Sequence, residues 1–409
     1  YKQDMSLDVT FPNPKNVWAL RGVQQTIAHI RILNGLENTS DDDSFKLQIQ
    51  EASDELGRAL TNNRSDSYIM SSCNALRFNQ TVREGTMQLP NGTQIIYALR
   101  EGHASADFEF ADKSQDKYYT NATPLLLIHG FLDSWKSWQE VLKSLGSERK
   151  IVAISLRGFG DHSKYNSDNG TPVEEYYTIE QQINDIYHFL SIGNFLDRNG
   201  QVLIAGHALG AMVALGFSLK HEDMVKGIVL LNGAATLPES RTINSPGLGI
   251  IEKSFTLAQL TQVFEKWMDP TTDFNRGFIR NRYKVFLKEF QFRTSVKKVK
   301  GNILPLVDVE VESKLLEESL KSDVFAQGHM WKAAMNVDYT GDLDQIIAPS
   351  VIIWGTNDTL FTHDDQKILM DEMKSSKRVF RTIKGAGYGL IWTHPQQVAD
   401  FINTFVRSF

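Results

Sequence analysis

Gln201-Val-Leu-Ile-Ala-Gly-His-Ala-Leu-Gly-Ala-Met-Val-Ala-Leu-Gly216 is the stretch of sequence that decides the fold. The apolar run at 202–205 predicts a strand that is buried on both faces. Gly206 and Gly210 predict a sharp turn, because glycine adopts backbone conformations that are closed to other residues. The small and apolar residues that follow predict a helix. We therefore expect a strand, a tight turn that presents Ala208, and a closely packed helix.

Similar apolar runs recur along the chain and alternate with helical patterns. The sequence predicts a β-hairpin at 86–99 and a helix after Thr178, whose spacing to Gln181 is that of a capping box. Strands that alternate with helices are typical of a parallel sheet covered by helices on both faces, the α/β class. Besides 202–205, single strands are predicted at 124–128, 151–156, 228–231 and 351–354.

Composition sets limits on the kind of protein. The chain has 409 residues, 41% of them hydrophobic and 22% charged, with a formal net charge of -6. This balance allows a large core and gives no basic surface for nucleic acid. No apolar run reaches the roughly 18 residues of a transmembrane segment. The single cysteine, Cys73, allows no internal disulfide. We expect a soluble protein; the oligomeric state cannot be read from the sequence.

Sequons favour the secretory pathway. Seven Asn residues stand in the N-x-[ST] pattern, mostly in the first half of the chain. Asn357 adjoins a candidate site residue and is the least expected to be modified. The chain begins at Tyr1 and not at Met, as it would after removal of a signal peptide. We expect a secreted or secretory-pathway glycoprotein, with a cytoplasmic protein as the alternative. The candidate glycosylation sites are Asn38, Asn63, Asn79, Asn91, Asn121 and Asn169.

Five short motifs follow the predicted strands. They are His129-Gly-Phe131, Arg157-Gly-Phe-Gly-Asp161, the turn around Ala208, Gly355-Thr-Asn-Asp358 and Gly385-Ala-Gly-Tyr-Gly-Leu-Ile-Trp-Thr-His-Pro395. Together, from residue 85 onward, they resemble the α/β-hydrolase superfamily, in the cap-bearing branch of epoxide hydrolases, lactonases and small-molecule esterases. The turn resembles the nucleophile elbow G-x-S-x-G. The resemblance implies an α/β-hydrolase fold with a mostly parallel central sheet, helices on both faces and a helical cap inserted after strand 6.

The same resemblance divides the chain into three parts. Residues 1–84, with helical patterns at 17–33 and 45–60, are expected to form an N-terminal helical extension. Residues 85–235 and 349–409 are expected to form the α/β-hydrolase core. Residues 236–348 stand where this family inserts its helical cap, which closes over the elbow and shapes a substrate pocket.

The catalytic triad that the resemblance implies is incomplete. Ala208 stands where the nucleophilic serine belongs, and Tyr388 stands where the histidine base belongs. Asp358, directly after a predicted strand, matches the acid. A phenol has a reference pKa near 10, so a tyrosine is a poor proton acceptor at neutral pH. His394 lies too far along the chain to replace the base, at the start of the last predicted helix.

Other parts of the implied site are retained. The oxyanion hole of the family uses backbone N–H groups, which correspond here to Phe131 and Leu209. A hydrogen bond between Asp358 and Tyr388 would make the phenol an oriented proton donor. No cofactor and no metal are implied. The other residues expected at the pocket are His129, Gly130, His207 and Trp392, with a structural role favoured for the two histidines.

Three explanations of the missing pair remain open. The first is a protein that has abandoned hydrolysis and performs cyclase- or lyase-type chemistry on a small apolar molecule. The second is a receptor or carrier that binds such a molecule unchanged. The third is an ester, lactone or epoxide hydrolase whose nucleophile has been replaced by Ala208. Tyr388 argues against the third, because one substitution is enough to inactivate a triad.

Overall fold

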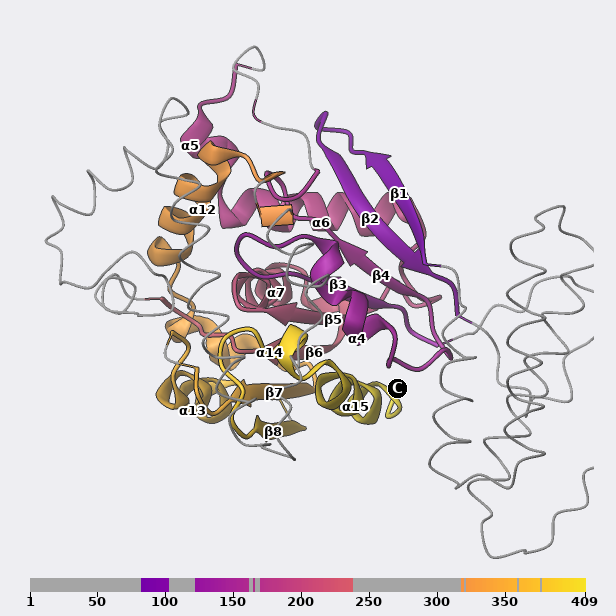
Figure 1. The fold of residues 1–409 in the computed structure, drawn as a ribbon, viewed down its shortest axis with the longest axis vertical. Coiled ribbons are helices and arrows are strands. Elements are labelled where there is room, and N and C mark those ends of the chain that lie inside the picture. Colours follow the sequence, from indigo (N-terminus) through magenta and orange to yellow (C-terminus); the bar gives the residue numbers. More distant parts are fainter. Residues whose placement is uncertain are drawn as a thin grey trace, which may run out of the picture. The chain divides into compact units, whose positions relative to one another are not determined.

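Eight strands form one sheet at the centre of the described part of the chain (Figure 1). This computed structural model describes residues 82–102, 122–161, 165, 170–237, 318–319, 321–358, 360–375 and 377–409. The order across the sheet is β1-β2-β4-β3-β5-β6-β7-β8. The strands are β1 (Arg83–Gln88), β2 (Gln94–Arg100), β3 (Leu125–Ile128), β4 (Ile151–Ile154), β5 (Val202–His207), β6 (Val225–Leu231), β7 (Ser350–Gly355) and β8 (Arg378–Ile383).

The pairing confirms the predicted α/β class. From β4 to β8 every neighbouring pair is parallel, while β1 pairs with β2, and β2 with β4, in antiparallel orientation. β3, β4 and β5 are buried along their whole length, which is why they read as continuous apolar runs. The predicted hairpin is confirmed as β1 and β2, whose turn is closed by Gly92 N–H donating to the Leu89 carbonyl at 3.0 Å.

Five of the described helices pack on the sheet in two groups. α6 contacts α7, whereas α4, α14 and α15 contact one another, and Figure 1 shows the two groups on opposite sides of the sheet. The predicted cap of α6 is confirmed, because Thr178 Oγ1 accepts from Gln181 N at 3.1 Å. The α-helices are α4 (Gln139–Leu142), α5 (Val173–Tyr176), α6 (Ile179–Gly193), α7 (Leu209–Lys220), α12 (Val324–Asn336), α13 (His363–Glu372), α14 (Leu390–Thr393) and α15 (Pro395–Val406).

Chain contacts divide the protein into two compact units. One unit contains residues 1–81 and 104–118, and the other contains residues 82–103 and 119–409. β1 begins at Arg83, slightly before the predicted start of the core at residue 85. α12 lies within the range predicted for the helical cap. The two N-terminal helical patterns, Cys73, most of the predicted cap, and the sequons at Asn38, Asn63, Asn79, Asn121 and Asn169 lie outside the described residues.

Unusual backbone conformations gather where the parallel strands end. Leu132, Ala208 and Asn232 all have positive φ angles, of 64°, 52° and 45°, and they follow β3, β5 and β6. Residues other than glycine adopt such angles at a cost and keep them only where the surroundings enforce them. Backbone strain is therefore concentrated at the carboxyl edge of the sheet, and the candidate site lies there.

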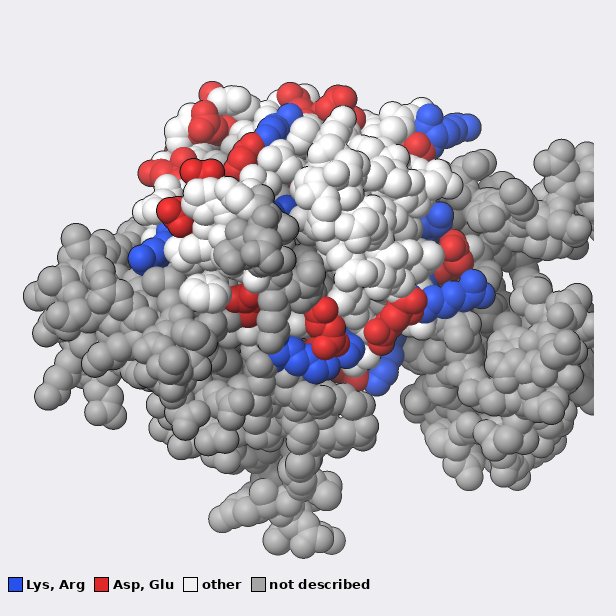
Figure 2. Space-filling model, turned by 90° about the horizontal axis from the view of Figure 1, so that it is seen from above, with Lys and Arg blue, Asp and Glu red and all other residues white. Residues whose placement is uncertain are grey.

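The surface shows mixed charge. On the face seen in Figure 2, Lys and Arg side chains are scattered among Asp and Glu side chains over the described residues, with a broad uncharged area between them. Within the same residues, no helix is long and apolar enough to cross a membrane.

Candidate functional site

The turn at 206–210, called the 208 turn below, has the shape that the sequence predicts. Ala208 has φ 52° and ψ -111°, and its side chain is buried. Its N–H donates to the Leu231 carbonyl at 2.9 Å, and its own carbonyl accepts from Ala211 N and Met212 N at the start of α7. The turn joins β5 to α7 without a gap, so a strained residue is held by backbone bonds on both sides.

The two glycines of the 208 turn act differently from the prediction. Their φ angles are not positive, and the strain falls on Ala208 instead. A Cβ on Gly206 would lie 2.2 Å from the Gly210 carbonyl oxygen, and one on Gly210 would lie 2.4 Å from the Ile128 carbonyl oxygen. Glycine is required at both positions because the backbone passes too closely for a side chain, and not because of its conformational freedom.

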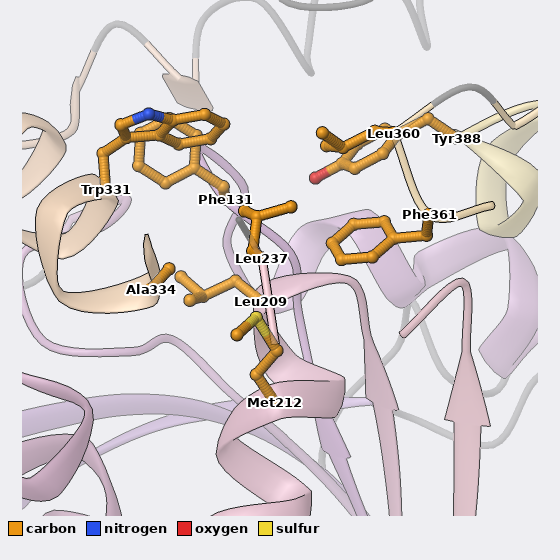
Figure 3. A pocket seen from close by; sticks show the side chains of 9 residues that line it. All are labelled: Phe131, Leu209, Met212, Leu237, Trp331, Ala334, Leu360, Phe361 and Tyr388. Atoms are coloured by element: carbon orange, nitrogen blue, oxygen red, sulfur yellow. The ribbon is translucent and has the colours of Figure 1, made fainter. Parts of the chain in front are cut away.

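A small apolar pocket opens beside the 208 turn, with about 270 Å³ of empty space, part of it open to solvent. Figure 3 shows the rings of Phe131 and Trp331 together on one side and those of Phe361 and Tyr388 on the other. The Tyr388 hydroxyl points into the space between them. The nine lining residues are Phe131, Leu209, Met212, Leu237, Trp331, Ala334, Leu360, Phe361 and Tyr388. Among these side chains only that of Tyr388 carries an oxygen or a charge.

Residues 385–389, called the 388 loop below, are fixed through the carbonyl oxygen of Tyr388. It accepts from His207 Nε2 at 2.8 Å and from Asn232 Nδ2 at 3.0 Å. The same Asn232 amide donates to the Gly387 carbonyl, and its oxygen accepts from Gly355 N at 2.9 Å. The 388 loop is thus tied to the ends of β5, β6 and β7. This rigidity sets the direction of the Tyr388 phenol.

Asp358 organises its own loop. Its Oδ1 accepts from Leu360 N at 2.8 Å and from Phe361 N at 3.1 Å, and the carboxyl group is buried. Trp354 Nε1 donates to the Phe361 carbonyl at 2.8 Å. Leu360 and Phe361 both line the pocket, so Asp358 holds part of the pocket wall. The predicted hydrogen bond between Asp358 and Tyr388 stays a prediction.

Of the remaining predicted residues, only Phe131 and Leu209 line the pocket. His129 Nε2 accepts from Leu156 N at 2.9 Å, so its proton is on Nδ1, which donates to the Gly130 carbonyl. His394 is buried, with Nδ1 2.7 Å from Thr393 Oγ1. Trp392 is buried in α14. Phe131 and Leu209 both line the pocket, while their oxyanion role stays a prediction.

A buried carboxylate anchors the segment that leads into α12. Glu318 accepts from Ser134 Oγ at 3.0 Å, from Lys136 Nζ at 2.9 Å and from Lys321 Nζ at 2.7 Å. Burial disfavours the Lys321 ammonium, but its hydrogen bonds to Glu318 and Asp161 outweigh this and raise its pKa. Because α12 supplies Trp331 and Ala334 to the pocket, this cluster positions one wall of it.

Several site residues were not predicted from the sequence. Most of the apolar lining belongs to this group, as do Asp133 and Asn232. Asn232 directly follows a predicted strand, and Asp133 stands two residues after the His129-Gly-Phe131 motif, which could have drawn attention to them. The unpredicted lining residues are Met212, Leu237, Trp331, Ala334, Leu360 and Phe361.

Two other predictions bear on the described residues. Asn91, a predicted glycosylation site, lies in the β1–β2 turn and donates through Nδ2 to Asp185 Oδ1 at 2.9 Å. Its modification stays a prediction. No group of three or more His, Cys, Asp or Glu side chains that could hold a metal ion occurs among the residues the structure describes.

The turn, the strand order and the loop after β8 agree with a sequence comparison. Residues 123–393 match the family model described as "alpha/beta hydrolase fold". The chain belongs to the α/β-hydrolase family. The match begins just before β3 and ends in α14, and so covers the 208 turn, Asp358 and the 388 loop.

Relatives within the α/β-hydrolase family include epoxide hydrolases. Epoxide hydrolase 3 of Xenopus tropicalis is 24% identical over 306 residues, which cover 69% of this chain and 71% of that protein. Epoxide hydrolase 4 of Homo sapiens is 28% identical over 287 residues, covering 69% and 72%. The solved structure of an esterase from Exiguobacterium antarcticum is similar with a TM-score of 0.56 at 14% identity, covering 80% of this chain and 100% of that one.

Proposed function

We propose that this α/β-hydrolase-fold protein binds a small apolar molecule in the pocket beside the 208 turn and converts it without hydrolysis, with Tyr388 as proton donor. One observation carries the proposal: the phenol of Tyr388 points into an apolar pocket and is the one hydroxyl among the side chains that line it. The family membership and the epoxide hydrolases among the relatives agree with a small-molecule ligand.

The chemistry follows from what each position offers. Ala208 presents a methyl group, which has no lone pair and forms no covalent intermediate. In an apolar pocket a hydrogen bond is stronger than in water, so the Tyr388 phenol can polarise and protonate an oxygen of the ligand. Backbone N–H groups at Phe131 and Leu209 would support a developing negative charge. These groups are suited to ring opening, isomerisation or elimination of an apolar molecule that carries an oxygen.

The relatives narrow the ligand class. Proteins named epoxide hydrolases act on epoxides, which are small molecules with one reactive oxygen. We propose a ligand of the same class for this pocket. Its apolar part contacts the aromatic rings on both sides of the pocket, and its one oxygen accepts a hydrogen bond from Tyr388. A purely hydrocarbon ligand would leave the phenol without a role.

A direct test uses the unmodified protein with apolar epoxides, lactones and aryl esters. Binding is followed through the fluorescence of Trp331, which lines the pocket, and products by mass spectrometry. The expected result is saturable binding and an isomer or elimination product, with conversion lost in Tyr388→Phe. A product that has gained one water would contradict the proposal, and binding without conversion would favour a carrier.

A second candidate is ester hydrolysis that lacks only its nucleophile. The strained backbone of Ala208 favours it, because φ 52° and ψ -111° are kept although no catalytic side chain depends on them. Restoring a hydroxyl at position 208 with Ala208→Ser and assaying ester cleavage tests this candidate.

A further inference from the structure

Polar atoms from three separate segments converge on Gly130, which has no side chain. A Cβ at Gly130 would lie 2.8 Å from His207 Nδ1, 3.1 Å from Tyr388 Oη and 3.2 Å from Asp133 Oδ2. His207 is 0% and Asp133 2% exposed, while Tyr388 is half-buried and faces the pocket. Three titratable groups therefore share the space of one absent side chain, at the wall of an apolar pocket.

The hydrogen bond between His207 and the 388 loop determines which ring nitrogen carries the proton. His207 Nε2 lies 2.8 Å from the Tyr388 carbonyl oxygen, and a carbonyl only accepts, so Nε2 is the donor. In the neutral imidazole the other nitrogen, Nδ1, then presents its lone pair. That nitrogen is the one directed at Gly130, beside the phenol and the Asp133 carboxyl group.

The backbone brings Asp133 to this place. Asp133 N donates to the Gly130 carbonyl at 3.3 Å, which closes a turn over residues 130–133. Within this turn Leu132 is fully buried with φ 64°, and its carbonyl accepts from Ser319 Oγ at 2.6 Å. A strained, buried leucine held in this way indicates that the position of the turn matters beyond packing.

We propose that Asp133, His207 and Tyr388 form an acid–base relay in which Tyr388 is the group that contacts the ligand. His207 Nδ1 takes the proton of the phenol, which leaves a phenolate and an imidazolium. The Asp133 carboxylate stabilises the imidazolium, and the reverse transfer returns the proton to Tyr388. No oxidant, reductant or further reactant takes part.

The relay deepens the proposed function and rests on it only for the contact between Tyr388 and the ligand. It gives the Tyr388 proton an acceptor, His207 Nδ1, from which the same proton returns. An imidazole from the 208 turn then serves the 388 loop, where the family's own histidine is replaced by a phenol. His207 and Asp133 act through Tyr388 and are therefore positioning and activating residues.

Covalent labelling tests the relay without any knowledge of the ligand. Benzenesulfonyl fluoride is small and apolar, and a tyrosine oxygen attacks its sulfur while fluoride leaves and a base takes the phenol proton. We expect Tyr388 to be the fastest-labelled tyrosine when modified peptides are mapped by mass spectrometry. Tyr388→Phe removes that labelled peptide.

Variants of His207 and Asp133 show whether Tyr388 is labelled fast because these residues activate its phenol or only because the phenol is accessible. In His207→Gln an amide N–H can still donate to the Tyr388 carbonyl, but the imidazole that accepts the phenol proton is gone, so the labelling rate should fall by roughly 100-fold. Asp133→Asn should lower the rate less. His221→Gln, at the far end of α7, is the matched histidine control and should leave the rate unchanged.

The proposal is overturned if Tyr388 is labelled no faster than other tyrosines, or equally fast in a folded His207→Gln protein. Thermal unfolding of each variant establishes folding. If His207→Gln does not fold, Gly130→Ala decides, because its methyl would occupy the shared space while all three side chains remain. Slower labelling at Tyr388 supports the relay, and an unchanged rate contradicts it. Since no ligand is present, these results are independent of the test for conversion.

Discussion

The 208 turn and the 388 loop lie at the same edge of the sheet, and each carries a residue other than the one a hydrolase triad requires. At the 208 turn the backbone has a strained conformation and the side chain is a methyl group. At the 388 loop the side chain is still polar and points into the pocket. Of the two positions, Tyr388 is therefore the one whose side chain can donate a proton.

The largest effect is expected from closing the space that the 208 turn needs. In Gly210→Ala the new methyl would meet the carbonyl oxygens of Ile128 and His129 at 2.4 and 2.5 Å. Because backbone cannot move aside cheaply, unfolding free energy should fall by about 3 kcal/mol or more, measured by chemical denaturation. Gly341→Ala, where no atom lies within 4 Å of the added Cβ, is the control and should change stability by less than about 0.5 kcal/mol. Equal stability of the two variants would contradict the close approach.

The next largest effect is expected from removing the Asn232 hydrogen bonds that hold the 388 loop. Asn232→Ala removes hydrogen bonds to Gly387, Tyr388 and Gly355 from a fully buried site, which should cost about 2 to 3 kcal/mol. Asn232→Gly loses the same bonds but tolerates φ 45°, and should be about 1 kcal/mol more stable than the alanine variant. The measurement is chemical denaturation of both. If the alanine variant is as stable as the unmodified protein, the 388 loop is held by something else.

A smaller effect distinguishes two roles of Asp358. Asp358→Ala removes the acceptor of Leu360 N and Phe361 N, and should cost about 1 to 2 kcal/mol and weaken ligand binding. Asp358→Asn keeps an oxygen in that place and should behave nearly like the unmodified protein in denaturation and in titration by tryptophan fluorescence. If Asn is as harmful as Ala, the negative charge matters and the wall-positioning role is wrong.

The smallest effect tests the strain itself. Ala208→Gly relieves an unfavourable backbone conformation but adds freedom to the unfolded chain, so stability should rise by no more than about 1 kcal/mol. Ala214→Gly in the middle of α7 has no strain to relieve and should be destabilising by about 1 kcal/mol. Thermal unfolding compares the two. A loss at position 208 as large as that at 214 would show that the turn stores no strain.

The fold could be predicted because buried parallel strands consist of short runs of consecutive apolar residues. β3, β5 and β7 stand close to where those runs predict them, and the Thr178 cap begins α6 at the expected residue. The positions of Ala208 and Tyr388 followed from spacing within motifs. These features depend on neighbours in the sequence, which is why the sequence alone revealed them.

Much of the site could not be predicted, because it depends on contacts between distant segments. Trp331 reaches the pocket from α12, inside the range predicted for the cap and more than 100 residues along the chain from the 208 turn. Asp133 turns toward Gly130 through the backbone of Leu132, and no pattern in the sequence signals a positive φ at a leucine. The role of the glycines in the 208 turn was also wrongly predicted, since close approach of two backbones is a tertiary property.

The most direct test asks whether position 388 as well as position 208 prevents ester hydrolysis. It measures ester cleavage by Ala208→Ser, alone and combined with Tyr388→His. The account predicts no cleavage of aryl esters or lactones by the single variant, because the 388 loop offers a phenol and not the imidazole base of the triad. The double variant should cleave them measurably. Cleavage by Ala208→Ser alone, at the rate of the double variant, would contradict the account and identify a hydrolase that lacks only its nucleophile.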